Sequence, residues 1–170
     1  LPPHPGRTVR ARHPTTLGGR LETRTGEPLK VTHESDGRYV VALEYGDSIR
    51  ECIEGLAADE NIVGAKLSAI GAIRDPELGA YDLESQTYTR QDFPGIWELV
   101  SFQGNITLLD GKPFMHAHIS ICGHDFKVMG GHLFDAEVAV VFECFMEPVA
   151  TPLKRIPCAA IGLARWEPGS

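Results

Sequence analysis

The order of apolar and polar residues predicts a chain built mainly of β-strands. Apolar and polar positions alternate, or apolar residues run together between Gly, Pro, Asn and Asp, over most of the sequence after residue 37. Strands are expected at residues 38–45, 62–73, 97–109 and 137–147, around a hairpin at Glu84-Ser85, and within 156–166. Asp110-Gly111 is typical of a hairpin turn, Asp75-Pro76 is expected to turn the chain, and Gly104 is expected to mark a bulge or bend.

One segment has helical periodicity instead. Ser48 and Glu51 form a capping box, and the apolar residues after it recur at a helical spacing: Ile49, Cys52, Ile53, Leu56 and Ala57. A helix is therefore expected from this cap to about Asn61. One helix among seven to eight strands with mostly hairpin connections indicates an α+β fold, a single compact domain with a mainly antiparallel sheet.

The composition divides the chain into three parts. Residues 1–37 are rich in Pro, Gly and Arg and are expected to form a basic arm or extension. Residues 38–147 are expected to form the folded domain, and residues 148–170 a C-terminal extension packed on it. Residues 152–157, within this extension, suggest no function from their sequence.

Charge is distributed unevenly along the chain, which carries a net charge of −7. Residues 1–30 hold six Arg or Lys and two Glu, a net charge of +4, whereas the remainder has a net charge of −11. The acidic body repels nucleic acid phosphates. The basic arm is expected to lie along a neighbouring acidic subunit, although contact with phosphate or an anionic substrate stays open.

The cysteines and the lack of long apolar runs point to a cytoplasmic protein. The four cysteines are widely spaced within apolar segments, which is typical of buried thiols in a reducing compartment: Cys52, Cys122, Cys144 and Cys158. No run of residues has the length and apolar character of a membrane span, and the first residues do not resemble a secretory signal.

Three histidines close together in the sequence are the strongest chemical signal. Because side chains alternate along a strand, His116 and His118 share one face. If Gly123 to Asp125 form a three-residue loop, the returning strand places His132 directly opposite His116. Three neutral imidazoles with an open fourth position are typical of a catalytic metal site, and zinc is the ion that they most often suit.

Two alternatives to this site stay open. A two-residue loop would shift the register by one and turn His132 to the other face of the sheet. The histidines would also be explained as hydrogen-bonded groups of a half-buried sheet without a metal. Iron, nickel, cobalt and copper remain alternatives to zinc.

Several residues near these histidines are candidates for supporting roles. Glu98 is the candidate general base, metal-orienting group or interface residue. Ser101, Asn105 and, more weakly, Gln103 are candidates for hydrogen bonding to a substrate, and Arg74 for holding a substrate carboxylate. Cys122 is a reserve metal ligand, and Glu143, in an apolar strand, is expected to need a partner.

Six short motifs in a fixed order resemble the PPC domain, the plant and prokaryote conserved domain. They are the Gly46-Asp47-Ser48 helix start, residues 67–73, 78–81, 97–106 and 112–118, and Gly130-Gly131-His132-Leu133. The resemblance covers roughly residues 38–147. It implies a homotrimer, and it implies that the equivalents of His116, His118 and His132 form a metal site, usually zinc, in bacterial and archaeal members.

Plant members of this family carry AT-hook motifs that bind A·T-rich DNA, and this sequence lacks the Arg-Gly-Arg-Pro core of such a motif. Two functions are therefore considered. The first is a trimeric metal-binding protein whose open coordination position would suit a small-molecule lyase or hydrolase of unknown substrate. The second is a DNA-associated or regulatory protein without catalytic activity, in which the basic arm contacts nucleic acid.

Overall fold

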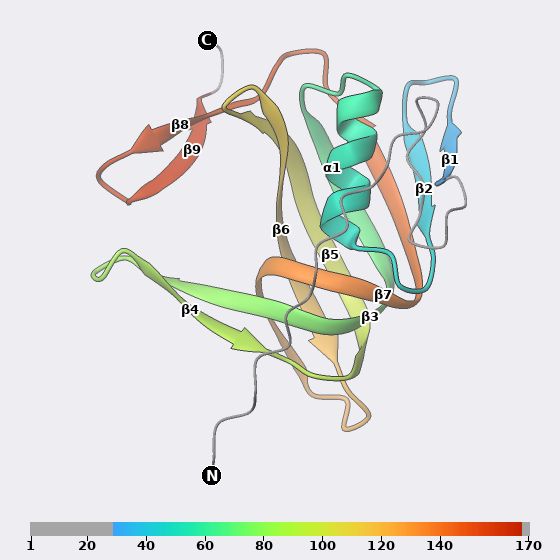
Figure 1. Cartoon of the computed structure of the whole chain (residues 1–170), viewed down its shortest axis with the longest axis vertical. Helices are drawn as coiled ribbons and strands as arrows, with labels where there is room; N and C mark the ends of the chain where they lie inside the picture. Colours follow the sequence, from blue (N-terminus) through green and yellow to red (C-terminus); the bar gives the residue numbers. More distant parts are fainter. Residues whose placement is uncertain (1–28, 168–170) are drawn as a thin grey trace.

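The computed structural model describes residues 29–167, which form one curved nine-stranded sheet and one helix (Figure 1). The elements are β1 Lys30–His33, β2 Tyr39–Leu43, α1 Ile49–Asp59, β3 Ala65–Asp82, β4 Thr87–Asp92, β5 Ile96–Leu109, β6 Lys112–Cys122, β7 Val128–Pro148, β8 Lys154–Cys158 and β9 Leu163–Glu167. All pairings between strands are antiparallel within this range except that of β5 with β8. The predicted α+β class and mainly antiparallel sheet are confirmed. No helix in the described range is long and apolar enough to cross a membrane.

Two long bent strands, β3 and β7, give the sheet its curvature. The first part of β7 pairs with β6, and the second part pairs with β2, while β3 pairs with β7 along most of its length. β5 lies between β3 and β6. Each long strand therefore takes part in two regions of the sheet, and the bend of β7 carries His132 beside β6 and away from its continuation next to β2 (Figure 1).

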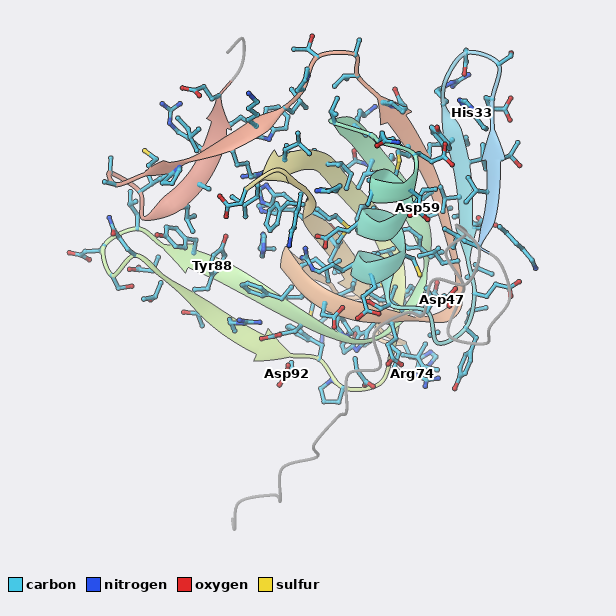
Figure 2. The ribbon with its side chains drawn as sticks, turned by 45° about the horizontal axis from the view of Figure 1, so that its top comes forward. His33, Asp47, Asp59, Arg74, Tyr88 and Asp92 are labelled. Atoms are coloured by element: carbon cyan, nitrogen blue, oxygen red, sulfur yellow. The ribbon has the colours of Figure 1, made fainter. Side chains whose placement is uncertain are left out.

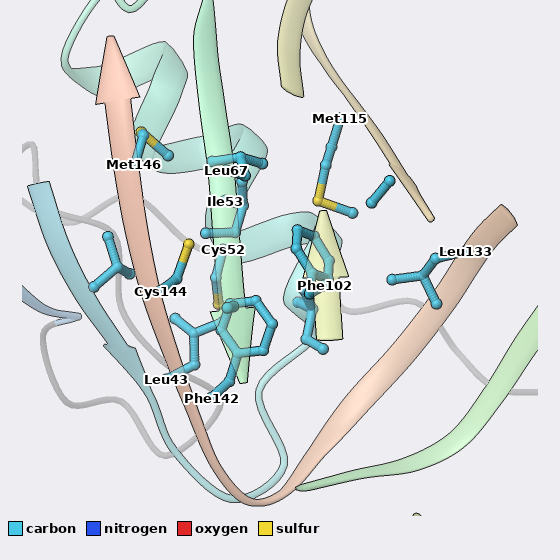
Figure 3. Close-up of a cluster of buried hydrophobic side chains, with 14 of the residues drawn as sticks. Leu43, Cys52, Ile53, Leu67, Phe102, Met115, Leu133, Phe142, Cys144 and Met146 are labelled. Atoms are coloured by element: carbon cyan, nitrogen blue, oxygen red, sulfur yellow. The ribbon is translucent and has the colours of Figure 1, made fainter. Parts of the chain in front are cut away.

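Helix α1 covers the inner face of the sheet, and its predicted cap and apolar stripe are confirmed. The Ser48 side chain accepts a hydrogen bond from the backbone N–H of Glu51, and the five apolar positions of the stripe are buried. They pack into the cluster drawn in Figure 3, which surrounds Phe102 and Phe142. These two rings meet edge to face, with centroids 5.3 Å apart.

The opposite face of the sheet carries exposed apolar side chains. Cross-strand pairing places Val40 opposite Phe145, Phe145 opposite Ser68, Ser68 opposite Gln103, and Gln103 opposite His118. Residues directly opposite each other share a face. Val40, Ile70, Val141 and Phe145 are all exposed on this outer face, and Phe145 is 54% exposed. His118 lies at one end of the same row.

Three local predictions about the strands were wrong. Asp75-Pro76 does not end a strand, because Asp75 bonds Gly95 through both its backbone N–H and its side chain, so β3 bends there and continues. In the pairings of β5 with β3 and β6, the bulges lie between Ala69 and Gly71 and between Leu99 and Ser101, not at Gly104. Glu143 needs no buried partner, because its side chain is exposed on the outer face.

Residues 156–166 form a hairpin of β8 and β9 and not a single strand. The base of this hairpin is joined to β5, where the Leu108 N–H donates to the Leu153 carbonyl at 2.7 Å. Its tip meets the β3–β4 hairpin, where the Tyr81 hydroxyl donates to the Ile161 carbonyl at 2.5 Å. The segment before β2, which the sequence assigned to an extension, likewise contributes a strand, β1, to the sheet.

Candidate metal centre

His116, His118 and His132 come together on β6 and β7. One ring nitrogen of each lies within 4.8 Å of one from each of the other two. The ring centroids are 5.2 Å apart for His116 and His118, 5.0 Å for His116 and His132, and 5.7 Å for His118 and His132. The structure therefore places three histidines so that they can bind one metal ion.

The predicted register between these strands was wrong by two residues. His132 lies opposite His118, not His116, because five residues separate Cys122 from its partner Val128. The predicted three-residue loop placed Phe126 in the returning strand. Phe126 instead lies in the loop, with a left-handed φ of 59°. A shift of two keeps the same face of the strand, so the cluster still forms. Gly130 consequently faces Ser120, where a Cβ atom would lie 2.2 Å from the Ile119 carbonyl oxygen.

Arg50 of α1 fixes the backbone on both sides of the cluster. The strands β6 and β7 stop pairing at the histidines, which leaves backbone carbonyls without ladder partners. The Arg50 guanidinium donates to the carbonyls of Met115, Leu133 and Phe134 at 2.9–3.1 Å. Its ion-pair partner Glu54 accepts the Met115 N–H at 2.9 Å. The helix thus holds the residues adjacent to His116 and His132.

We expect Arg50→Met to weaken metal binding without removing a ligand. The variant would leave three partly buried carbonyls without donors, each costing about 1–3 kcal/mol. The strands would then separate more freely and spread the histidines. Metal affinity, measured by chelator competition, should fall by roughly 10-fold, the lower range for loss of an outer supporting contact. Arg38→Met is the matched control, because the Arg38 side chain pairs with exposed Asp36. Equal affinities in the two variants would contradict this role.

Burial keeps two of the rings neutral. Removal from water, and then the positive charge of Arg155, lower the pKa of His116 to about 4. Burial, followed by the neighbouring His116 and His118, lowers the pKa of His132 to about 4. Neutral imidazole is the form that coordinates metal, so these rings need not lose a proton at neutral pH. The buried Nδ1 of His132 has no hydrogen-bond partner.

Arg155 of β8 contacts the cluster from the side of the C-terminal hairpin. Its Nη2 lies 2.8 Å from Nδ1 of His116. A guanidinium can only donate, so Nδ1 accepts and the neutral ring carries its proton on Nε2. A metal ion on His116 would therefore require this hydrogen bond to break. Burial lowers the pKa of Arg155.

A cavity of about 560 Å³ opens beside His116 and His132. It lies between the C-terminal hairpin and the β3–β4 hairpin, and Figure 2 shows Tyr88 on the side of the latter that faces β8 and β9. Tyr88 and Phe134 pack against His132, with ring centroids 5.0 and 4.7 Å from it. Gly79 leaves room for both, since a Cβ atom there would lie 2.5 Å from the Phe134 ring.

The structure places the other candidate residues at different distances from the cluster. Asn105 lines the cavity, and its side-chain oxygen accepts a bond from Arg155 at 3.4 Å. Gln103 lies opposite His118 but donates to Ser68, at 3.0 Å. Ser101 lies opposite Ser120, two pairs further along the same ladder.

Three candidates lie away from the cluster. Glu98 and Cys122 face each other at the far end of the β5–β6 ladder, four positions from His118, or roughly 13 Å at the rise of a strand. Within one chain, neither reaches the histidines. Arg74 lies elsewhere (Figure 2). It donates to the Tyr45 hydroxyl at 2.8 Å, and its guanidinium lies over that ring.

The sequence did not identify Arg50, Arg155, Tyr88 or Phe134 as parts of this site. Arg155 lies 39 residues after His116, in a segment that has no recognisable motif. The one available signal was an arginine between the apolar residues Leu153 and Ile156. Arg50 sits beside the apolar stripe of α1 and looked like an ordinary exposed helix residue.

Comparison with known proteins places these features in a family. Residues 31–149 match the model of the Plants and Prokaryotes Conserved (PCC) domain. No protein of curated function matches the chain. A plant- and prokaryote-conserved (PPC) protein of Pyrococcus horikoshii is 30% identical, with a TM-score of 0.73, and the match covers 84% of this chain and 96% of that protein.

Two further solved structures are similar to this chain, one of a metal-containing protein and one of a candidate DNA-binding protein. A metal-containing protein of Archaeoglobus fulgidus is 32% identical with a TM-score of 0.73, over 83% of this chain and 99% of that one. A protein of Ralstonia eutropha described as a candidate DNA-binding protein is 26% identical with a TM-score of 0.72, over 88% of this chain and 96% of that one.

Proposed function

The chain belongs to the Plants and Prokaryotes Conserved domain family, and from this premise we propose that it is a homotrimeric metal-binding protein. His116, His118 and His132 hold a divalent transition metal, zinc by the preference of three imidazoles for that ion. The observation that carries the proposal is the buried, unpartnered Nδ1 of His132 beside two more imidazoles. A buried polar atom without a partner is costly unless something binds it.

The donor set fits a metal with an open coordination position. Three protein ligands leave room for water or substrate, which is the arrangement of catalytic zinc. When bound, such an ion lowers the pKa of water and polarises carbonyl oxygens, which suits a small-molecule hydrolase or lyase. The aromatic rings of Tyr88 and Phe134 exclude water from one side of His132, and Arg50 keeps the strands in place.

Zinc titration of chelator-treated protein tests this proposal. We expect about one ion per chain, bound tightly enough to compete with a colorimetric chelator. Arg155 opposes the ion, because its hydrogen bond to His116 must break. A protein that takes up no zinc, nickel, cobalt or iron above the level of a histidine-free variant would contradict the proposal.

The outer face of the sheet supports the trimer. It exposes Val40, Ile70 and Phe145 in adjoining positions, and large exposed apolar patches mark interfaces. His118 lies in the same row and is exposed. A subunit packed on this face would therefore approach the metal centre. We propose Glu98 of that neighbouring subunit as the general base. The four unpaired cysteines support a cytoplasmic location.

We expect the protein to have three times the mass of one chain by light scattering, and Ile70→Asp to reduce the assembly to single chains. A carboxylate at the centre of an apolar interface would be desolvated without a partner. Leu83→Asp is the matched control, because Leu83 is similarly exposed but lies in the turn between β3 and β4, outside the outer-face row. A monomeric wild type, or an Ile70→Asp variant that remains trimeric, would contradict this interface.

A second function, DNA association, is favoured by the Ralstonia eutropha relative and by the basic residues 1–30. Binding through phosphate contacts would weaken steeply with salt, and deletion of residues 1–30 would flatten that dependence. Residues 1–28 lie outside the described range. Fluorescence anisotropy with a labelled A·T-rich duplex distinguishes the functions: no binding at low salt would exclude DNA association, whereas salt-dependent binding that the deletion removes would favour it.

A further inference from the structure

We propose that the cavity beside the histidines binds a small organic acid, with Arg155 holding its carboxylate and the aromatic wall taking its apolar body. The inference names a ligand class for the proposed metal centre and rests on that function for its chemistry. Acid recognition itself depends on residues of the cavity and not on a metal ion.

The cavity has the size and the lining of a small-molecule site. Its volume of about 560 Å³ falls within the usual range for ligand pockets, roughly 300–1,000 Å³. Phe114 and Leu109 line it from the β5–β6 hairpin, Leu163 and Trp166 from β9, and Tyr88 from β4. This wall suits an apolar or aromatic body, and two of the three histidines, His116 and His132, are at the cavity surface.

The charge of the cavity is positive and uncompensated. Its lining includes Arg155 and Arg165 but no Asp or Glu. Within residues 29–167, neither arginine forms an ion pair with a carboxylate. A partly buried cation without an opposite charge is costly, and a bound anion would offset that cost.

Arg155 is held in place by neutral acceptors alone. It donates to the Thr107 hydroxyl at 2.9 Å, to the Ala164 carbonyl at 3.0 Å, and to Asn105 and His116. These bonds fix the plane of the guanidinium beside the cavity but leave its charge unneutralised. The bond to Asn105, at 3.4 Å, is long. One Nη1 hydrogen has no acceptor among the described residues, so a carboxylate can bind without disrupting the anchoring bonds.

This part of the cavity is supplied by the C-terminal hairpin. Arg155, Leu163, Arg165 and Trp166 all lie after residue 149, where the match to the family model ends. The family domain thus contributes the histidines and part of the apolar wall, and the extension contributes both arginines and the rest of the wall. Acid recognition is therefore a property that the extension adds to the metal centre of the domain.

The test compares an acid with its neutral analogue in metal-free and zinc-loaded full-length protein. The probes are 4-fluorobenzoate and 4-fluorobenzyl alcohol, followed by fluorine NMR titration. We expect the wild type, with or without zinc, to bind the acid at least about tenfold more tightly than the alcohol, as for a hydrogen bond to a charged group. In the metal-free protein, Arg155→Met should abolish that preference, and the variant should still take up zinc when zinc is added. Arg74→Met, which removes an exposed arginine outside the cavity, should retain it.

Each outcome supports or overturns the inference. The inference is overturned by equal binding of both probes, by binding of neither at about 10 mM, or by an unchanged preference in metal-free Arg155→Met. If Arg155→Met does not fold, Ala164→Phe replaces it, since a larger side chain on the cavity wall should exclude both probes. Acid binding without zinc uptake would contradict only the proposed function, and zinc uptake without acid preference only this inference.

Discussion

The His132→Ala variant is expected to lose metal affinity by at least about 100-fold while keeping its fold. Loss of an outer contact to a metal ligand already costs about 10–100-fold, and loss of a ligand costs more. His132 is also the histidine whose Nδ1 is buried without another partner. The fold should persist because its core lies on the other face of the sheet, around Phe102 and Phe142.

Affinity is measured by zinc competition with a chelator, and fold by circular dichroism and melting temperature. His124→Ala is the matched control, because His124 is exposed in the β6–β7 loop and should leave affinity unchanged. Unfolding of His132→Ala would indicate a structural ion on which the domain depends. Unchanged zinc affinity in His132→Ala would remove this residue from the site.

Phe142→Ala is expected to destabilise the protein by about 3–5 kcal/mol, the usual cost of removing a large side chain from a packed core. Phe142 is fully buried on β7 and meets Phe102 edge to face. A typical domain is stable by only about 5–15 kcal/mol, so this variant should be close to unfolding. Figure 3 shows the Phe142 ring beside Leu43 and Phe102, within the buried cluster.

Chemical denaturation measures this loss, and Phe126→Ala is its control. Phe126 is 84% exposed in the β6–β7 loop and packs against no core residue, so its removal should change stability by less than about 0.5 kcal/mol. A loss below about 1 kcal/mol in Phe142→Ala would show that the core repacks around the missing ring.

Local signals in the sequence predicted the helix and the faces of the strands. The cap at Ser48 and the stripe from Ile49 to Ala57 lie within three turns of one helix, so no distant contact was needed to find them. The common face of His116 and His118 follows from strand geometry alone. Loop length was harder to predict. The β6–β7 loop has five residues, and Phe126 within it takes a left-handed conformation that is uncommon for a bulky side chain.

The rest of the site depends on contacts between distant segments. Arg50 acts on carbonyls that become free only because β6 and β7 separate after the histidines. Arg155 reaches His116 because residues 154–167 form a hairpin joined to both β5 and the β3–β4 hairpin. Neither arrangement leaves a periodic pattern in the sequence, and both follow from the tertiary fold.

The central claim is that the three histidines bind a metal, and elemental analysis tests it most directly. Untagged protein purified without chelator is compared with His116→Ala prepared in parallel, with metal content measured per chain. We predict about one transition-metal ion per chain in the wild type and a near-complete loss in the variant. Absence of metal from both proteins, or equal metal in both, would contradict the account.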